Sequence, residues 1–169
     1  VLLGGCQGHV SKKPGSEVLI EGDGKFPDFL AGRWKANKGG WEFVFDQDGK
    51  ISSAVISLGR IRLKPGEITE VPMIKDGKGV FEPGRWTVYY RPSERELTVK
   101  LSLKRFRIEV GDNILEGKST DVFVGPVSED GTIWQADWTG FPEYVAHTPE
   151  HPRFKFPIDP NLGGPADTI

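Results

Sequence analysis

A single cysteine is present among 169 residues, and neither sign of charge dominates, with 22 basic residues against 24 acidic ones. A lone cysteine excludes an intrachain disulfide and any zinc or iron–sulfur site that needs several cysteines. The near balance of charge lacks the basic surface typical of proteins that bind nucleic acids, so nucleic acid is not an expected partner. No apolar run approaches the roughly 20 residues that a membrane-spanning helix needs.

Motifs of common catalytic sites are missing as well. The chain contains neither the GxxxxGK[ST] phosphate loop nor the GxSxG nucleophile elbow. Two segments partly match the motifs of metal sites, HTPEH at 147–151 and DQDG at 46–49. Pro149 and Pro152 oppose the helix that the first would need, and Ser57 stands where a calcium loop needs an acidic residue. We therefore expect no metal site and no cofactor, and nothing in the sequence nominates an enzyme.

What the chain does contain is typical of short strands joined by turns: 22 Gly, 13 Pro, five Trp and ten Phe. Glycine and proline interrupt helices, whereas aromatic side chains pack well on pleated sheets. From residue 26 onward the apolar residues recur mainly with period two. Predicted strands cover 32–37, 41–45, 51–58, 60–64 or 67–73, 78–82, 86–90, 95–110, 114–124 and 132–138.

The predicted strand 95–110 changes its facing part-way along. Leu97 to Leu103 alternate on one parity, whereas Phe106 to Val110 alternate on the other. An extra residue near Lys104-Arg105 would return both sets to one face, so we predict a β-bulge there.

The amino terminus reads Val1-Leu2-Leu3-Gly4-Gly5-Cys6. Apolar residues followed by small ones are typical of the end of a signal peptide, so we interpret residues 1–5 as its remnant. Leu3-Gly4-Gly5-Cys6 resembles the lipobox of bacterial lipoproteins. The resemblance implies a diacylglycerol on Cys6, an extracytoplasmic location and a membrane as partner. Gln7, in place of the aspartate that often retains such proteins at the inner membrane, favours the periplasmic side of the outer membrane.

The composition divides the rest of the chain into three segments. Residues 6–25 are mostly polar and are predicted to be a lipidated tether, and residues 26–140 are predicted to be one β-domain. Residues 141–169 form a Pro-rich C-terminal extension, expected to pack on the domain or on a partner, with room for one helical turn at 143–147.

About eight strands joined by tight turns favour an all-β fold, specifically an antiparallel up-and-down barrel, with a two-sheet β-sandwich as the alternative. Gly32-Arg33-Trp34, at the first predicted strand of the domain, resembles the Gly-x-Trp of lipocalins and related calycins. The resemblance implies a cup-shaped barrel that binds a small, often apolar ligand, with Gly32 and Trp34 closing one end.

The apolar parity of the strands places Trp86, Tyr90, Trp134 and Trp138 on the inner side. Either facing of strand 114–124 also places a charged residue inside, and Asp121 is that residue if Leu115 and Phe123 face inward. An unpaired buried charge is costly, and a filled or wet cup would relieve that cost. These five residues are therefore the predicted contacts of a small apolar or amphipathic ligand. The competing hypothesis is a packed, non-catalytic interaction or assembly subunit of a cell-envelope complex.

Overall fold

The computed structural model describes residues 15–22, 24–56, 61–147 and 167–168. Within these ranges the chain is all-β, with one 3-10 helix, η1 (Asp28–Leu30), and no α-helix. The strands are β1 (Ser16–Ile20), β2 (Gly32–Lys35), β3 (Glu42–Phe45), β4 (Ile51–Ile56), β5 (Ile61–Leu63), β6 (Thr69–Pro72), β7 (Lys78–Pro83), β8 (Trp86–Arg91), β9 (Glu96–Val110), β10 (Asn113–Pro126), β11 (Gln135–His147) and β12 (Asp167–Thr168).

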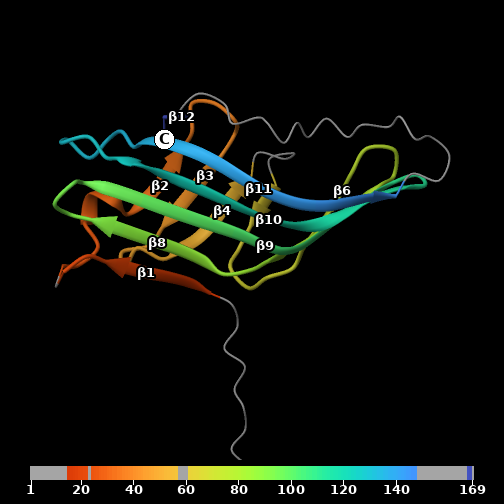
Figure 1. The fold of residues 1–169 in the computed structure, drawn as a ribbon, viewed down its shortest axis with the longest axis horizontal. Coiled ribbons are helices and arrows are strands. Elements are labelled where there is room, and N and C mark those ends of the chain that lie inside the picture. The colour runs from red at the N-terminus through yellow and green to blue at the C-terminus, as the bar shows by residue number, and fades with distance from the viewer. Residues whose placement is uncertain (1–14, 23, 57–60, 148–166, 169) are drawn as a thin grey trace, which may run out of the picture.

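These strands form two sheets (Figure 1). The smaller sheet is the antiparallel meander β2-β3-β4-β5. The larger sheet has the order β1-β8-β9-β10-β11-β12, with β7 beside β9 and β6 beside β7. Strands β7 and β8 pair with successive parts of β9, so they run as one interrupted strand beside it.

The prediction of an up-and-down barrel is wrong, and the two-sheet alternative fits. Among the described residues no ladder joins the two sheets. Strands β9, β10 and β11 have 13 to 15 residues, whereas those of the smaller sheet have three to six. Strands of such unequal length cannot pair along their whole length around a barrel. The core is instead made by stacking the inner faces of the sheets.

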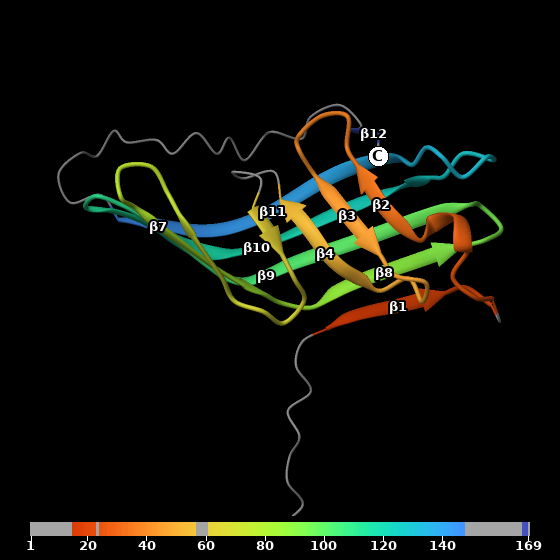
Figure 2. The same cartoon turned by 180° about the vertical axis from the view of Figure 1, so that it is seen from behind.

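The smaller sheet lies across only one half of the larger one (Figure 2). We call the uncovered part the overhang; it consists of β6, β7 and the adjoining halves of β9, β10 and β11. Its inner face is apolar, with Phe81, Phe106 and Leu115 buried and Val71 packed against them.

The β-bulge in β9 is confirmed. Leu103 pairs with Ser119 and Phe106 pairs with Gly117, so three steps along β9 match two along β10. The same irregularity appears against β7. The extra residue restores one inward face, because both Leu101 and Ile108 are buried.

The ends of the predicted domain need correction. Part of the predicted tether is strand β1, which pairs in parallel with β8 and buries Val18 and Ile20 partly against the core. At the other end, residues 141–147 continue β11 instead of starting an extension, so the helical turn predicted at 143–147 is wrong. Their pairing with β10 supplies the hydrogen bonds that a helical turn would have had to provide.

Candidate functional site

Aromatic side chains fill the space between the sheets. Trp86, Tyr90 and Trp134 are almost completely buried. Phe123 of β10 contacts Trp41 edge-on, with ring centroids 4.8 Å apart. The remaining ring pairs have centroids 5.0 to 6.5 Å apart and connect Trp41, Phe43, Phe45, Phe123, Trp134 and Trp138 in one cluster. Such distances are ordinary packing contacts and leave no room for a ligand between the rings.

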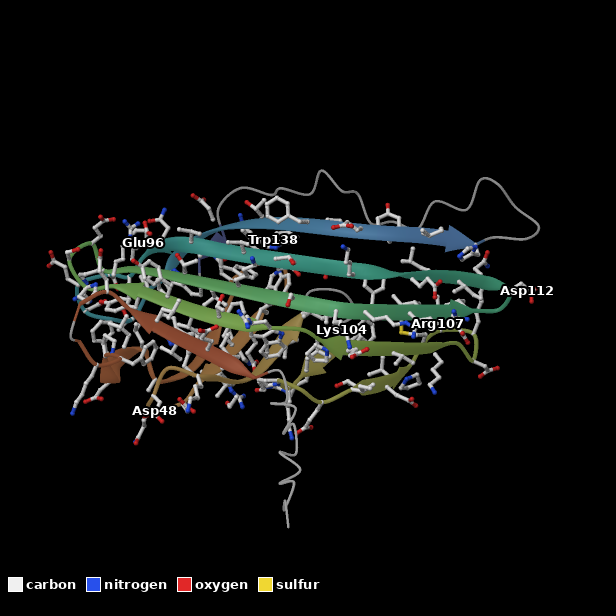
Figure 3. All side chains as sticks on the ribbon, turned by 60° about the horizontal axis from the view of Figure 1, so that its bottom comes forward. Asp48, Glu96, Lys104, Arg107, Asp112 and Trp138 are labelled. Atoms are coloured by element: carbon white, nitrogen blue, oxygen red, sulfur yellow. The ribbon has the colours of Figure 1, made fainter. Side chains whose placement is uncertain are left out.

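Two hollows in the described part of the chain lie elsewhere. One of about 470 Å³ is lined by residues that include Ser102, Lys104 and Lys118, and one of about 240 Å³ includes Val80 and Arg107. Figure 3 shows Lys104 and Arg107 along β9. Neither hollow is lined by any of the five predicted ligand contacts. Ligand binding by Trp86, Tyr90, Trp134 and Trp138 stays a prediction.

Asp121 and Trp138 lie together at the margin of the aromatic cluster. Phe123 and Leu115 face inward on β10, and Asp121 shares their parity, opposite Gly140 of β11. Nε1 of Trp138 donates a hydrogen bond of 3.0 Å to Oδ1 of Asp121. Burial raises the pKa of Asp121 from 3.8 to about 6, and the Trp138 hydrogen bond opposes that rise. The buried acid is therefore costly to ionise, as the sequence suggested, but one indole satisfies part of its hydrogen bonding.

This environment predicts how stability depends on pH. Because the folded pKa of Asp121 lies above its unfolded value, its contribution to stability is greatest below about pH 4 and is lost as the pH rises to about 6. We expect Asp121→Asn, which keeps an acceptor for Trp138, to raise the free energy of unfolding at pH 7.5 by on the order of 2 kcal/mol and to change it little at pH 4. Urea unfolding at both pH values measures this.

The matched control is Asp137→Asn, at an exposed position on the neighbouring strand. It should leave the free energy of unfolding unchanged at both pH values. If Asp121→Asn lowered stability at pH 7.5, the carboxylate would be a favourable part of the fold and this reading of its environment would be wrong.

Gly32 and Trp34, predicted to close a barrel end, close none, because the strands do not form a closed barrel. Trp34 is buried instead in the shared core, and its Nε1 donates a 2.9 Å hydrogen bond to the carbonyl oxygen of Leu30. Gly32 begins β2 at a φ of 120°, in the region that favours glycine. Both residues fix how the chain passes from η1 into β2.

Comparison with known proteins gives no further guide to function. No family model matches the chain, and no curated protein or solved structure is significantly similar to it. The lipoprotein resemblance therefore stays a prediction, whereas the closed barrel that the lipocalin resemblance implied is not formed. Cys6 lies outside the described residues, as does 148–151 of the HTPEH segment. The DQDG segment at 46–49 forms the turn between β3 and β4, in which Oδ1 of Asp46 accepts hydrogen bonds from the backbone N–H of Asp48 and Lys50. In the described ranges, no helix is long and apolar enough to cross a membrane.

The outer face of the overhang is dominated by paired charges. Arg107 contacts both Glu109 and Glu116, and Nζ of Lys118 lies 3.0 Å from the carboxylate of Glu143. Cross-strand ion pairs of this kind are mutually satisfied and mainly keep the face hydrated.

Strand β11 differs from this pattern. Phe141 and Val145 on its outer face are 57% and 58% exposed, and Tyr144 on its inner face is 39% exposed. Among the described residues, only Gln135 and Ala136 of β11 pair on the side away from β10, with β12. Residues 137–147 thus combine exposed apolar side chains with an open strand edge. The sequence predicted that residues 141–169 pack on the domain or on a partner, but not that Phe141 and Tyr144 belong to an edge strand.

Proposed function

We propose that the protein is a non-catalytic interaction subunit of the bacterial cell envelope, anchored through acylated Cys6 on the periplasmic side, with the outer membrane favoured. Residues 137–147 of β11 supply its binding surface. The observation that carries this proposal is the open edge of β11 with Phe141 and Val145 exposed beside it. Long, apolar strand edges are normally covered, because their unpaired N–H and C=O groups and apolar side chains invite another strand.

The alternative, a small apolar or amphipathic ligand bound between the sheets, has less support. Its predicted contacts Trp86 and Trp134 are buried, Trp134 against the rings of Phe43 and Phe123, and neither of the hollows described above is lined by them. A ligand would have to displace packed aromatic side chains, whereas a partner at β11 covers surface that is already exposed.

The double substitution Phe141→Glu and Val145→Glu tests the binding surface. Two charges on this strip oppose its burial, so we expect the amount of partner recovered from gently solubilised membranes to fall at least about tenfold, which corresponds to 1.4 kcal/mol of binding free energy. Thermal unfolding should change little, because both side chains are exposed.

Ile74→Glu is the matched control. Ile74 is 75% exposed but lies in the turn between β6 and β7, far along the chain from β11. It should retain the complex at wild-type yield. A wild-type protein without any partner, or a double variant that keeps its partner, would contradict the proposal.

A further inference from the structure

The backbone of β11 turns its groups alternately toward β10 and toward the open edge. A Cβ at Gly117 would lie 2.1 Å from the carbonyl oxygen of Glu143, and one at Gly125 would lie 1.8 Å from that of Gln135. These carbonyls of odd-numbered residues therefore point toward β10. In an antiparallel pair the intervening residues point the other way, so the N–H and C=O groups of the even-numbered residues face the edge.

Pro142 fits this arrangement, because it is even-numbered and its missing N–H falls on the open side, where it costs no bond to β10. The open edge therefore presents full donor and acceptor pairs from 138, 140, 144 and 146, placed evenly on both sides of Pro142. Strand β12 pairs with Gln135 and Ala136 and ends the open stretch on one side, and His147 ends it on the other.

This symmetry about Pro142 is what a two-fold axis requires, and we propose that the edge of β11 pairs antiparallel with β11 of a second copy of this chain, with the axis at Pro142. The inference rests on the proposed function and names its partner. In this register residue 142 faces 142 of the second copy, and residues 137–147 pair over their full length without meeting β12. Two narrow pairs on each side of the axis supply about eight backbone hydrogen bonds.

Side-chain sizes on the inner face are complementary in this register. Trp138 faces Ala146 of the second copy, and Tyr144 faces Gly140. A large ring opposite a small residue fills the cross-strand position without crowding, and an aromatic ring over a strand glycine is a known stabilising pair. Gly140 is a position where a Cβ would lie 3.3 Å from Oδ1 of Asp121, which is tighter than ordinary contact.

On the outer face Phe141 directly faces Glu143 of the second copy, whose carboxylate is paired with Lys118 of its own chain. The two Phe141 rings lie diagonally across the axis, within the reach of aromatic side chains, so each covers part of the other. Val145 faces Thr139 of the second copy. Asp137 faces His147, which gives an opposite-charge pair when the imidazole is protonated. A closed, isologous dimer of this kind also protects the edge from further pairing.

A disulfide tests the register. Directly opposed residues in a narrow antiparallel pair have Cα atoms about 5.5 Å apart, which suits a disulfide. In the full-length chain with Cys6→Ser, so that the introduced thiol is the only one, Pro142→Cys should form a covalent dimer under mild oxidation. Thr139→Cys is the control, because residue 139 of the second copy then lies roughly 20 Å away. We expect at least about tenfold less covalent dimer from it.

Three results would overturn the inference, and they bear differently on the proposed function. Equal amounts of covalent dimer from Pro142→Cys and Thr139→Cys would mean that the disulfides form by random collision and not in a defined register. A complex with a different protein that depends on Phe141 and Val145, without a 142–142 disulfide, would remove the second copy as partner and leave the interaction function standing. A monomer in which the amide hydrogens of 138, 140, 144 and 146 resist exchange would show the edge covered within one chain and would remove both.

Discussion

Phe123→Ala should lower the free energy of unfolding by about 3–5 kcal/mol, the range for truncating a buried phenylalanine. Phe123 is completely buried between the sheets. Its ring meets Trp41 and Phe43 edge-on, with centroids 4.8 and 5.0 Å away, and it also contacts Trp134. Removal of the ring leaves a cavity among rigid aromatic neighbours that cannot easily close around it. Urea unfolding at pH 7 measures the loss.

Phe141→Ala is the control for this substitution, because the same residue type on the next strand is 57% exposed. It should change the free energy of unfolding by less than about 0.5 kcal/mol. If Phe123→Ala cost as little as Phe141→Ala, the space between the sheets would not be a packed core, and the ligand-binding alternative would regain support.

Gly125→Ala should destabilise the fold through a steric contact. The added Cβ would lie 1.8 Å from the carbonyl oxygen of Gln135 and 3.1 Å from Cα of Ala136. Both are backbone atoms of β11, so the strand itself would have to move, and the 3.1 Å hydrogen bond from Nε1 of Trp134 to the carbonyl oxygen of Gly125 would be strained. We expect a loss of about 3 kcal/mol, at the upper end for overpacking.

Gly24→Ala provides the comparison for Gly125→Ala. A Cβ there would come no closer than 3.4 Å to a neighbouring atom, the Cγ2 of Ile20, which is ordinary contact. Stability should stay within about 0.5 kcal/mol of the wild type. A well-folded Gly125→Ala protein of normal stability would mean that β10 and β11 are not as close as described.

Much of the fold could be predicted from the alternation of apolar and polar residues along single strands. The parity of Leu97 to Leu103 against that of Phe106 to Val110 placed the bulge in β9 correctly, because side-chain facing in a strand depends only on counting residues. The turn at 46–49 was predictable for a similar reason, since Asp46 caps its own turn through its side chain.

What failed depended on contacts distant in sequence. Tight turns are equally compatible with a barrel and with two stacked sheets. The two folds differ in whether a ladder joins the sheets, which local sequence patterns do not show. Residues 141–147 looked irregular because Pro142 interrupts the strand pattern, but a proline whose missing donor faces an open edge is compatible with a strand.

The candidate site shows the same division. The inward aromatic set was predicted correctly as a group, yet none of its members lines either of the two hollows in the described part of the chain, because packing density between two sheets does not follow from parity. The open edge of β11 could not be read from the sequence, because edge position is a property of the whole sheet.

Native mass spectrometry of the full-length protein, gently released from its own membrane, tests the central claim most directly. We expect the protein in a complex. Each copy of it should have the mass of its polypeptide and of the acyl groups on Cys6, with no further small molecule. A monomer that carries an additional small molecule, lost when Trp138 or Asp121 is substituted, would contradict the account and establish the space between the sheets as a binding site.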